Sequence, residues 1–324
     1  MAAVKSYNLN TRVKAGRLSD LSTITSQQIR DLMDEVSPGI SPVGIIGGPP
    51  CQGFSRGNAR ANPDDPRNLL PFKYADILAE LNERSQIHFF VFENVMGLMN
   101  RVHIERFRAI ERRFEDAGFN IFPQELNAHS FGVAQNRRRL FIVGLNSTLH
   151  PNIKFEFPKG RGPRHCVRDA IEGLPAPAFF RRGITGEEIP HHPNHWTMTP
   201  KSPKLGDGAS TDGRSFRKLL WDQESPTVAY GNREIHIHPD GGRRLSVHEA
   251  MLLQGFPRSY KLWGNFGQQV TQVCNAVPPP VARALARRIR KTLWPQTNGA
   301  QRQSGSSLEM EASDGCQSRD CQSG

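Results

Sequence analysis

The sequence predicts an α/β fold, in which a doubly wound and mostly parallel sheet is joined to a smaller region rich in loops. Three apolar runs lack the polar alternation of half-exposed strands and have the pattern of strands buried on both faces, at residues 43–48, 87–95 and 138–145. Helical patterns lie between these runs at strand–helix–strand spacing. Because ligands bind at the carboxyl ends of parallel strands, we expect polar residues flanking the runs to form a site.

Two amphipathic helices are predicted between the runs. The first covers residues 73–84, KYADILAELNER. In the second, apolar side chains recur at helical spacing and share one face, and a glycine follows where the helix should end. The apolar residues are Ile104, Phe107, Ile110 and Phe114, and the glycine is Gly118.

The texture of the sequence changes between about residues 146 and 240, where Pro, Gly, His and basic residues dominate and periodicity fades. Regular patterns return with a capping box formed by Ser246 and Glu249, and with a basic amphipathic helix over residues 281–294. We therefore expect an α/β domain, a separate loop-rich region and a disordered tail. The α/β domain covers residues 1–145 and returns over 241–294, the loop-rich region covers 146–240, and the tail covers 295–324.

The composition favours a nucleic-acid partner and argues against a membrane protein. The formal net charge is +11, and arginine pairs or triplets recur along the chain, which suits the neutralisation of phosphates. A solvated basic surface is the alternative interpretation. No apolar run approaches the roughly 20 residues that cross a bilayer, and the N-terminus has no signal-peptide pattern, so we expect a cytoplasmic protein.

The cysteines and histidines predict neither a disulfide scaffold nor a metal site. The five cysteines are scattered and odd in number. The histidines at 191–195 and 236–238 lack the Cys or carboxylate partners that would complete a zinc ligand set. Taken alone, Cys51 would more often be a small buried hydrophobe than a nucleophile.

The order of several short elements changes that interpretation of Cys51. GGPPCQGFS (47–55) precedes FENV (92–95), and QNRRR (135–139) follows. This order resembles the cytosine-C5 DNA methyltransferase family of bacterial type. Two later segments, RRLSVHEAMLLQGFP (243–257) and QVCNAVPPPVARALA (272–286), resemble that family's later motifs, so five elements in order span most of residues 43–290. The resemblance implies the sheet of an S-adenosylmethionine-dependent methyltransferase, with a target-recognition region over 146–240.

The resemblance also implies a chemistry for four residues. Cys51 would add covalently to C6 of a cytosine flipped out of the duplex, which makes C5 nucleophilic towards the methyl group of S-adenosylmethionine. Glu93 would contact N3 and the exocyclic amine and supply a proton. Arg137 would contact the pyrimidine carbonyl oxygen, Arg139 would support the site, and Arg138 is expected to face outwards.

Further residues match binding positions of the family. The resemblance implies that Pro49, Leu70, Asn275 and Val277 line the cofactor site and that Gln52, Ser55, Arg67 and Gln135 contact DNA. The loop after Cys51, QGFSRGNARANPDDPRN, combines glycines and arginines and suits closure over a phosphate backbone. A plain mobile surface loop is the alternative.

The cofactor motif of the family is the main departure. Nothing in residues 1–42 matches its glycine-rich F-x-G-x-G pattern, Arg17 stands where an acidic residue is usual, and Cys274 replaces a glycine. We expect a methyltransferase of a restriction–modification system that acts on double-stranded DNA, with a cognate endonuclease as a candidate partner, in an N-terminally shortened chain that begins after the cofactor motif. A non-catalytic DNA-binding remnant and a split enzyme completed by an N-terminal fragment are the alternatives. A tRNA-methylating relative is disfavoured because the variable region is long and basic.

Overall fold

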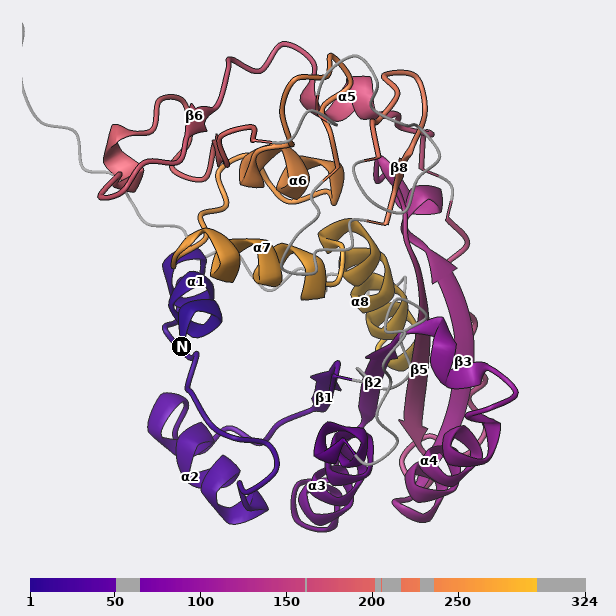
Figure 1. Cartoon of the computed structure of the whole chain (residues 1–324). Helices are drawn as coiled ribbons and strands as arrows, with labels where there is room; N and C mark the ends of the chain where they lie inside the picture. Colours follow the sequence, from indigo (N-terminus) through magenta and orange to yellow (C-terminus); the bar gives the residue numbers. More distant parts are fainter. Residues whose placement is uncertain (51–64, 161, 202–204, 206–216, 228–235, 296–324) are drawn as a thin grey trace, which may run out of the picture.

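A four-stranded sheet forms the centre of the molecule (Figure 1). The computed structural model describes residues 1–50, 65–160, 162–201, 205, 217–227 and 236–295. The strands stand in the order β1 (Gly44–Gly47), β2 (Phe89–Asn94), β5 (Arg138–Asn146) and β3 (Phe119–Asn127). The three predicted runs are thus strands of one sheet, and the α/β class is confirmed.

The direction of β5 differs from the expected mostly parallel sheet. Only β1 and β2 run parallel, whereas β5 is antiparallel to both β2 and β3. The reason lies in the connections: ten residues separate β3 from β5, which is too short for the crossover that a parallel neighbour needs. The strand β3 was not predicted, because polar residues interrupt the apolar ones over residues 119–127 and a proline lies inside the run.

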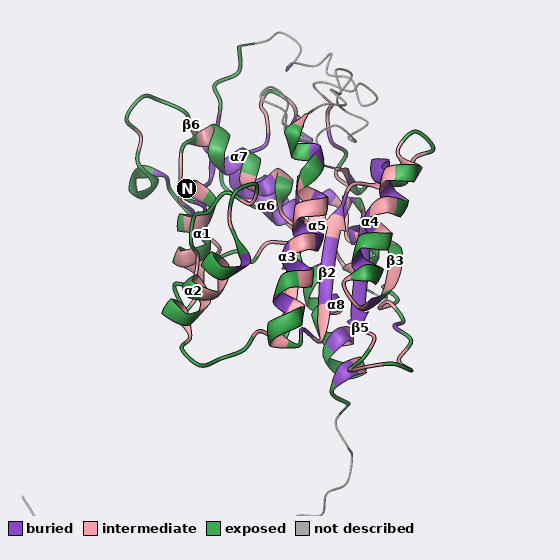
Figure 2. Cartoon of the chain, turned by 90° about the horizontal axis from the view of Figure 1, so that it is seen from below, coloured by how far each residue is buried: buried purple, intermediate pink, exposed green. Residues whose placement is uncertain are grey.

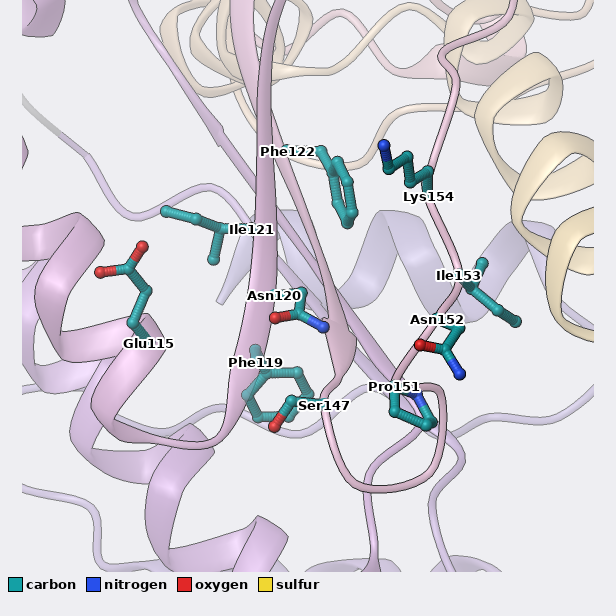
Figure 3. A pocket seen from close by; sticks show the side chains of 10 residues that line it. All are labelled: Glu115, Phe119, Asn120, Ile121, Phe122, Ser147, Pro151, Asn152, Ile153 and Lys154. Carbon is teal, nitrogen blue, oxygen red and sulfur yellow. The ribbon is translucent and has the colours of Figure 1, made fainter.

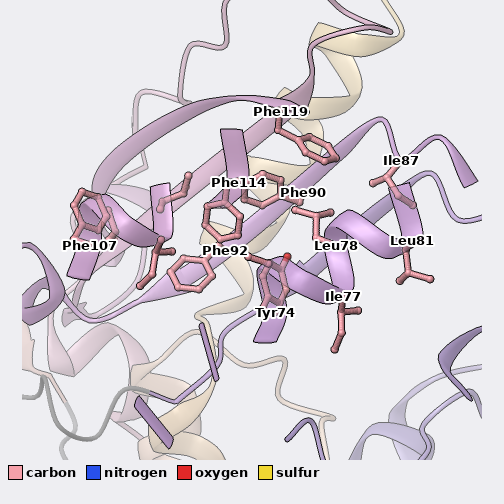
Figure 4. Close-up of a cluster of buried hydrophobic side chains, with 14 of the residues drawn as sticks. Tyr74, Ile77, Leu78, Leu81, Ile87, Phe90, Phe92, Phe107, Phe114 and Phe119 are labelled. Carbon is pink, nitrogen blue, oxygen red and sulfur yellow. The ribbon is translucent and has the colours of Figure 1, made fainter. Parts of the chain in front are cut away.

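Helices cover both faces of the sheet. On one face lie α3 (Leu70–Ser85) and α4 (Ile104–Asp116), whose apolar sides enclose a cluster rich in aromatic rings (Figure 4). Phe90 and Phe114 meet there with ring centroids 4.5 Å apart. On the other face lies α8 (Pro279–Leu293), which buries Val281, Leu285 and Ile289 against β2 and β5. The three helices confirm the periodicities read from the sequence.

A second core holds the loop-rich region together. Short elements surround it, and the buried residues come from both sides of residue 240. The helices α6 (Val247–Leu253) and α7 (Phe266–Asn275) pack in this core, whereas α8 alone returns to the sheet. The second core thus includes residues on both sides of the predicted boundary at residue 241, and the division of the chain there stays a prediction. The remaining short elements are α5 (Val167–Ile171), β4 (Gln135–Asn136), β6 (Ala178–Phe179), β7 (Trp196–Thr197), β8 (Ser225–Pro226), and the 3-10 turns η2 (Pro66–Leu69), η3 (Met96–Met99), η4 (Ala128–Phe131) and η5 (Gly186–Glu188).

The first 42 residues form helices and no strand. The helix α1 (Ala2–Asn10) is attached to the second core, because Asn10 donates to the carbonyl of Lys261 and accepts from its amide, at 2.8 and 2.9 Å. The helix α2 (Ser26–Val36) begins with a capping box at Thr25. In the burial view both helices are mostly a mixture of exposed and intermediate residues, whereas β2 and β5 are mostly buried (Figure 2). No helix in the described ranges is long and apolar enough to cross a membrane.

Three buried histidines gather beside the second core, and the exposed His191 lies next to them. The rings of His192 and His248 stack with centroids 3.9 Å apart, and His195 lies 5.8 Å from His248. His191 completes the group, 5.6 Å from His195. Among the described residues, no group of three or more His, Cys, Asp or Glu side chains is placed to hold a metal ion.

We expect this histidine cluster to make the fold sensitive to acid. Burial lowers the pKa of His192 to about 4 and that of His248 to about 3. The unfolded chain, with ordinary histidine pKa values near 6.5, binds more protons below that pH, so stability is lost as the pH falls from about 6.5 towards 4. Urea unfolding at pH 7 and pH 4.5 should show a loss of a few kcal/mol. The double variant His192→Gln, His248→Gln should lose the share of this pH dependence that these two residues contribute and keep the share of His236, whose pKa burial also lowers to about 4; an unchanged slope would refute the assignment.

Candidate active site

The carboxyl ends of β1 and β2 lie side by side and bring two predicted residues together. Asn94, the last residue of β2, donates its amide to the carbonyl of Pro49 at 3.3 Å, which holds the chain just after β1. The backbone passes close to Glu93 at this point: a Cβ at Gly48 would lie 2.9 Å from Glu93 Oε2. The glycines before Pro49 thus permit the close approach of the loop to the carboxylate.

The reversed direction of β5 brings the arginines to the same edge. Because β5 is antiparallel to β2, its first residues pair with the last ones of β2, Leu140 with Asn94. Arg139 Nε lies 3.3 Å from Glu93 Oε1, and both side chains are largely buried. Arg138 points away and pairs with Glu125 at 3.2 Å, with 63% of its side chain exposed, as predicted.

Burial sets the electrostatics of this group. Burial raises the pKa of Glu93, against the pull of the charges on Arg139 and Arg137. The same burial lowers the pKa of Arg137 to about 10 and also lowers that of Arg139. Both guanidinium groups therefore keep their charge at neutral pH, while the carboxyl holds its proton to a higher pH than an exposed glutamate does. Glu93 can therefore hold a proton beside the fixed positive charges of Arg137 and Arg139.

Arg137 connects this edge to the turn between α7 and α8. Its guanidinium is 2% exposed, and Nη2 donates to the carbonyls of Cys274 and Ala276 at 2.7 and 3.2 Å. A thiolate at Cys274 would lie close enough to raise the pKa of Arg137. The turn carries two predicted cofactor residues, the exposed Asn275 and the half-buried Val277.

The other predicted residues are placed as follows. Leu70 begins α3 and is half-buried. Arg67 is exposed and pairs with Asp65 at 2.6 Å. Gln135 is fully buried, and neither polar atom of its side chain has a partner among the described residues, so it does not reach the surface in this structure. Cys51, Gln52 and Ser55 lie outside the described residues.

The residues predicted to bind a cofactor form only one side of a site. Pro49, Asn275 and Val277 stand at or near the edge that bears Glu93. On the far side of β1, the chain forms the helices α1 and α2. Among residues 1–42 there is no glycine-rich turn between a strand and a helix that would offer its backbone amides to a cofactor. The described part of the chain thus fits half of a donor site.

A separate cavity of about 680 Å³ lies at the opposite end of the sheet (Figure 3). Phe119 and Ser147 lie on its wall, at the start of β3 and just after β5. This cavity is remote from Glu93, because Phe119 pairs with Asn146 at the end of β5 away from Arg139. We assign it no part in the site.

One residue of the site was missed from the sequence. Gln254 is fully buried and donates its side-chain amide to the carbonyls of Val273 and Ala276, both at 2.7 Å. The only sequence signal is its place at the end of the predicted helix, in QGFP (254–257). Its effect becomes visible only once α6 and α7 are packed together.

Comparison with known proteins gives a consistent result. The family described as C-5 cytosine-specific DNA methylase matches residues 2–291. The type II methyltransferase M.MthTI of Methanothermobacter thermautotrophicus is 36% identical over 274 residues, covering 78% of this chain and 79% of the relative. M.FnuDI of Fusobacterium nucleatum is 31% identical over 294 residues, covering 83% and 82%.

Solved structures share the fold. An E. coli prophage protein described as a DNA modification methyltransferase superposes with a TM-score of 0.69 at 23% identity, over 90% of each chain. The Dnmt2 methyltransferase of S. pombe superposes with a TM-score of 0.58 at 18% identity, over 89% of this chain and 87% of its own.

Proposed function

The chain belongs to the C-5 cytosine-specific DNA methylase family, and from this premise we propose how it methylates cytosine C5 in double-stranded DNA. The proposed methyl donor is S-adenosylmethionine, and the proposed nucleophile is Cys51. The observation that carries the proposal is the buried group of Glu93, Arg139 and Arg137, in which Glu93 lies against Gly48, three positions before Cys51 in the sequence.

The proposed chemistry begins with covalent addition to the base. Cys51 Sγ forms a bond with C6, the C5–C6 double bond opens, and electron density moves through the ring to N3. Glu93 donates its proton to N3, so that C5 acquires enamine character and becomes nucleophilic. After methylation, a solvent water takes the C5 proton, the Cys51–C6 bond breaks with its electron pair returning to the thiolate, and N3 gives its proton back to Glu93, which restores the aromatic ring. S-adenosylmethionine, when bound, supplies the methyl group.

The arginines stabilise the charge that develops in these steps. Arg137 Nε and Nη1 are buried and have no partner among the described residues, so they remain available to the carbonyl oxygen of the pyrimidine. Arg139 holds the Glu93 carboxyl in place through its 3.3 Å ion pair. We assign the first arginine to the base and the second to the carboxylate.

Access to the base requires the DNA to give up a stacked cytosine. Flipping the base out costs a few kcal/mol. Contacts to the phosphates and to the guanine that is left unpaired must offset this cost. The net charge of +11 supports such contacts. We propose Gln52, Ser55 and Arg67 as DNA-contacting residues, and residues 146–240 as the region that selects the sequence. The buried position of Gln135 suits a supporting role better than a direct contact.

The donor would be held by residues at two turns. Pro49 and Leu70 lie near the ends of β1 and α3, and Asn275 and Val277 lie on the turn between α7 and α8. Because these residues form one side only, we propose no geometry for the bound donor. The names of the relatives as type II methyltransferases support a restriction endonuclease as a functional partner.

The free edge of β1 favours a second candidate, a methyltransferase completed by a segment of another chain. Among the described residues β1 pairs with β2 alone, and Ile46 and Val43 beside its other edge are 75% and 53% exposed. An apolar hollow of about 350 Å³ next to α2 is lined by Ile29, Leu32, Met33 and others. Bare apolar edges of this kind pair readily with an added strand. A strand with a glycine-rich turn at its carboxyl end would then stand beside Pro49.

One experiment tests both candidates. The chain is incubated with duplex DNA containing 5-fluorocytosine, with and without S-adenosylmethionine, and covalent adducts are resolved on denaturing gels. A donor-dependent adduct that is absent in Cys51→Ser supports the enzyme acting alone. DNA binding without an adduct contradicts it. In that case, an adduct that forms only when a strand–turn–helix segment with the F-x-G-x-G pattern is co-expressed supports the completed enzyme.

A further inference from the structure

Two side chains hold the carbonyls at the end of α7. Gln254 Nε2 donates to Val273 and Ala276, and Arg137 Nη2 donates to Cys274 and Ala276. The last carbonyls of a helix have no partners within the helix, and they carry the negative end of its dipole. An amide and a guanidinium group therefore donate to three carbonyls at the end of α7 and in the turn to α8, those of Val273, Cys274 and Ala276.

Gln254 reaches this turn from the second core. It follows α6 directly, and every residue of α6 is buried. The next residue, Gly255, has a φ of +79°, and a Cβ there would lie 2.9 Å from Pro280 Cδ at the start of α8. The chain just after Gln254 therefore lies close against the start of α8.

The same place concentrates buried polar atoms without partners. Within the described residues, five of the ten such side-chain atoms belong to Gln135, Arg137 and Gln254. Arg137 and Gln254 share the carbonyl of Ala276, so each restricts the position of the other. Buried unpaired atoms cost free energy and are kept where a substrate or an ordered water uses them.

We propose that Gln254 is a positioning residue for the proposed methyl transfer. By holding Val273 and Ala276, it fixes the turn that carries Asn275 and Val277. By sharing the carbonyl of Ala276, it also keeps Nη2 of Arg137 bound and leaves the other nitrogens of that guanidinium for the base. The inference rests on the proposed function for its catalytic consequence, but the holding of the turn is a property of this chain alone.

The test compares Gln254→Met with Gln269→Met. Methionine keeps the length of the side chain and removes both donors. Gln269 is a matched control, since it is also buried, donates to the carbonyl of Gly264 at 2.8 Å and accepts from Trp196 at 2.8 Å, but lies within α7 away from the turn. Hydrogen exchange is measured for peptides that cover residues 272–280, together with the melting temperature of each variant.

Gln254→Met should increase exchange in the turn, whereas Gln269→Met should not, even at an equal drop in melting temperature. Steady-state kinetics should show KM for S-adenosylmethionine raised about tenfold and kcat lowered in the first variant alone, from the loss of two hydrogen bonds. Equal exchange in both variants, or a loss explained by melting temperature, would overturn the inference. If the unmodified chain does not methylate DNA, the proposed function fails while the exchange measurement still decides whether Gln254 holds the turn.

Discussion

Replacing Glu93 by glutamine is expected to lower the turnover of the proposed methylation by about 10²- to 10⁴-fold. Glutamine has the size of glutamate and can still accept from Arg139, which lies 3.3 Å from the carboxylate. It has no acidic proton to give to N3 of the base. The covalent addition at C6 would then leave charge on the ring that no proton neutralises, and the barrier rises accordingly.

The pH dependence gives a second measurement on the same residue. Burial raises the pKa of Glu93, so the protonated fraction falls as the pH rises through that raised value. The rate of the unmodified chain should therefore decline on the alkaline side, and Glu93→Gln should lack this decline. Transfer of a labelled methyl group in single turnovers across the pH range measures both rates.

Stability should not explain the loss. Since the pKa of Glu93 is higher in the folded chain than in the unfolded one, its ionisation destabilises the fold as the pH rises, and Glu93→Gln should melt no lower at neutral pH. Glu125→Gln is the matched control, because Glu125 pairs with Arg138 at 3.2 Å one strand away. An equal loss of turnover in both variants would contradict the role of Glu93.

Local pattern was enough to place each charged residue of the site on its own strand. Glu93 follows the apolar run Phe89–Phe92. In a strand buried on both faces, the first polar residue is expected where the strand reaches the edge of the sheet. Arg138 and Arg139 precede another such run, so alternation alone sends one outwards and one inwards. Glu93 and Arg139 became neighbours, however, only because β5 runs antiparallel to β2, which the pattern did not predict.

The features that were missed depend on contacts between distant segments. The direction of β5 follows from its short connection to β3. Because Pro123 interrupts the pattern of β3, that strand was not predicted, and β5 was expected to be parallel to its neighbours although it is antiparallel. The burial of Gln135 depends on its pairing with Ser225, ninety residues further along the chain. Gln254 acts through backbone carbonyls, which any sequence would supply. None of these leaves a periodic signal in the chain.

Replacing Arg137 by methionine is expected to lower kcat/KM by about 10²- to 10³-fold, the effect of removing one preorganised donor from a site of developing charge. The fold should tolerate the change. Of the two carbonyls that Arg137 holds, that of Ala276 keeps its bond from Gln254 at 2.7 Å. The variant also removes a cation from a position that is only 2% exposed, so the cost of burying that charge disappears and partly offsets the donor that the carbonyl of Cys274 loses.

Arg137→Lys separates the charge from the shape of the group. Lysine keeps the positive charge, but a single ammonium cannot both hold the turn at Cys274 and Ala276 and offer two further donors to the base. We therefore expect Arg137→Lys to lose nearly as much kcat/KM as the methionine variant, while Arg138→Met, with its exposed side chain, stays within about twofold of the unmodified chain. Activity retained in Arg137→Lys would mean that charge alone suffices. A large fall in melting temperature in Arg137→Met would assign Arg137 to the fold, because the buried donors Nε and Nη1 would then serve stability rather than the pyrimidine oxygen.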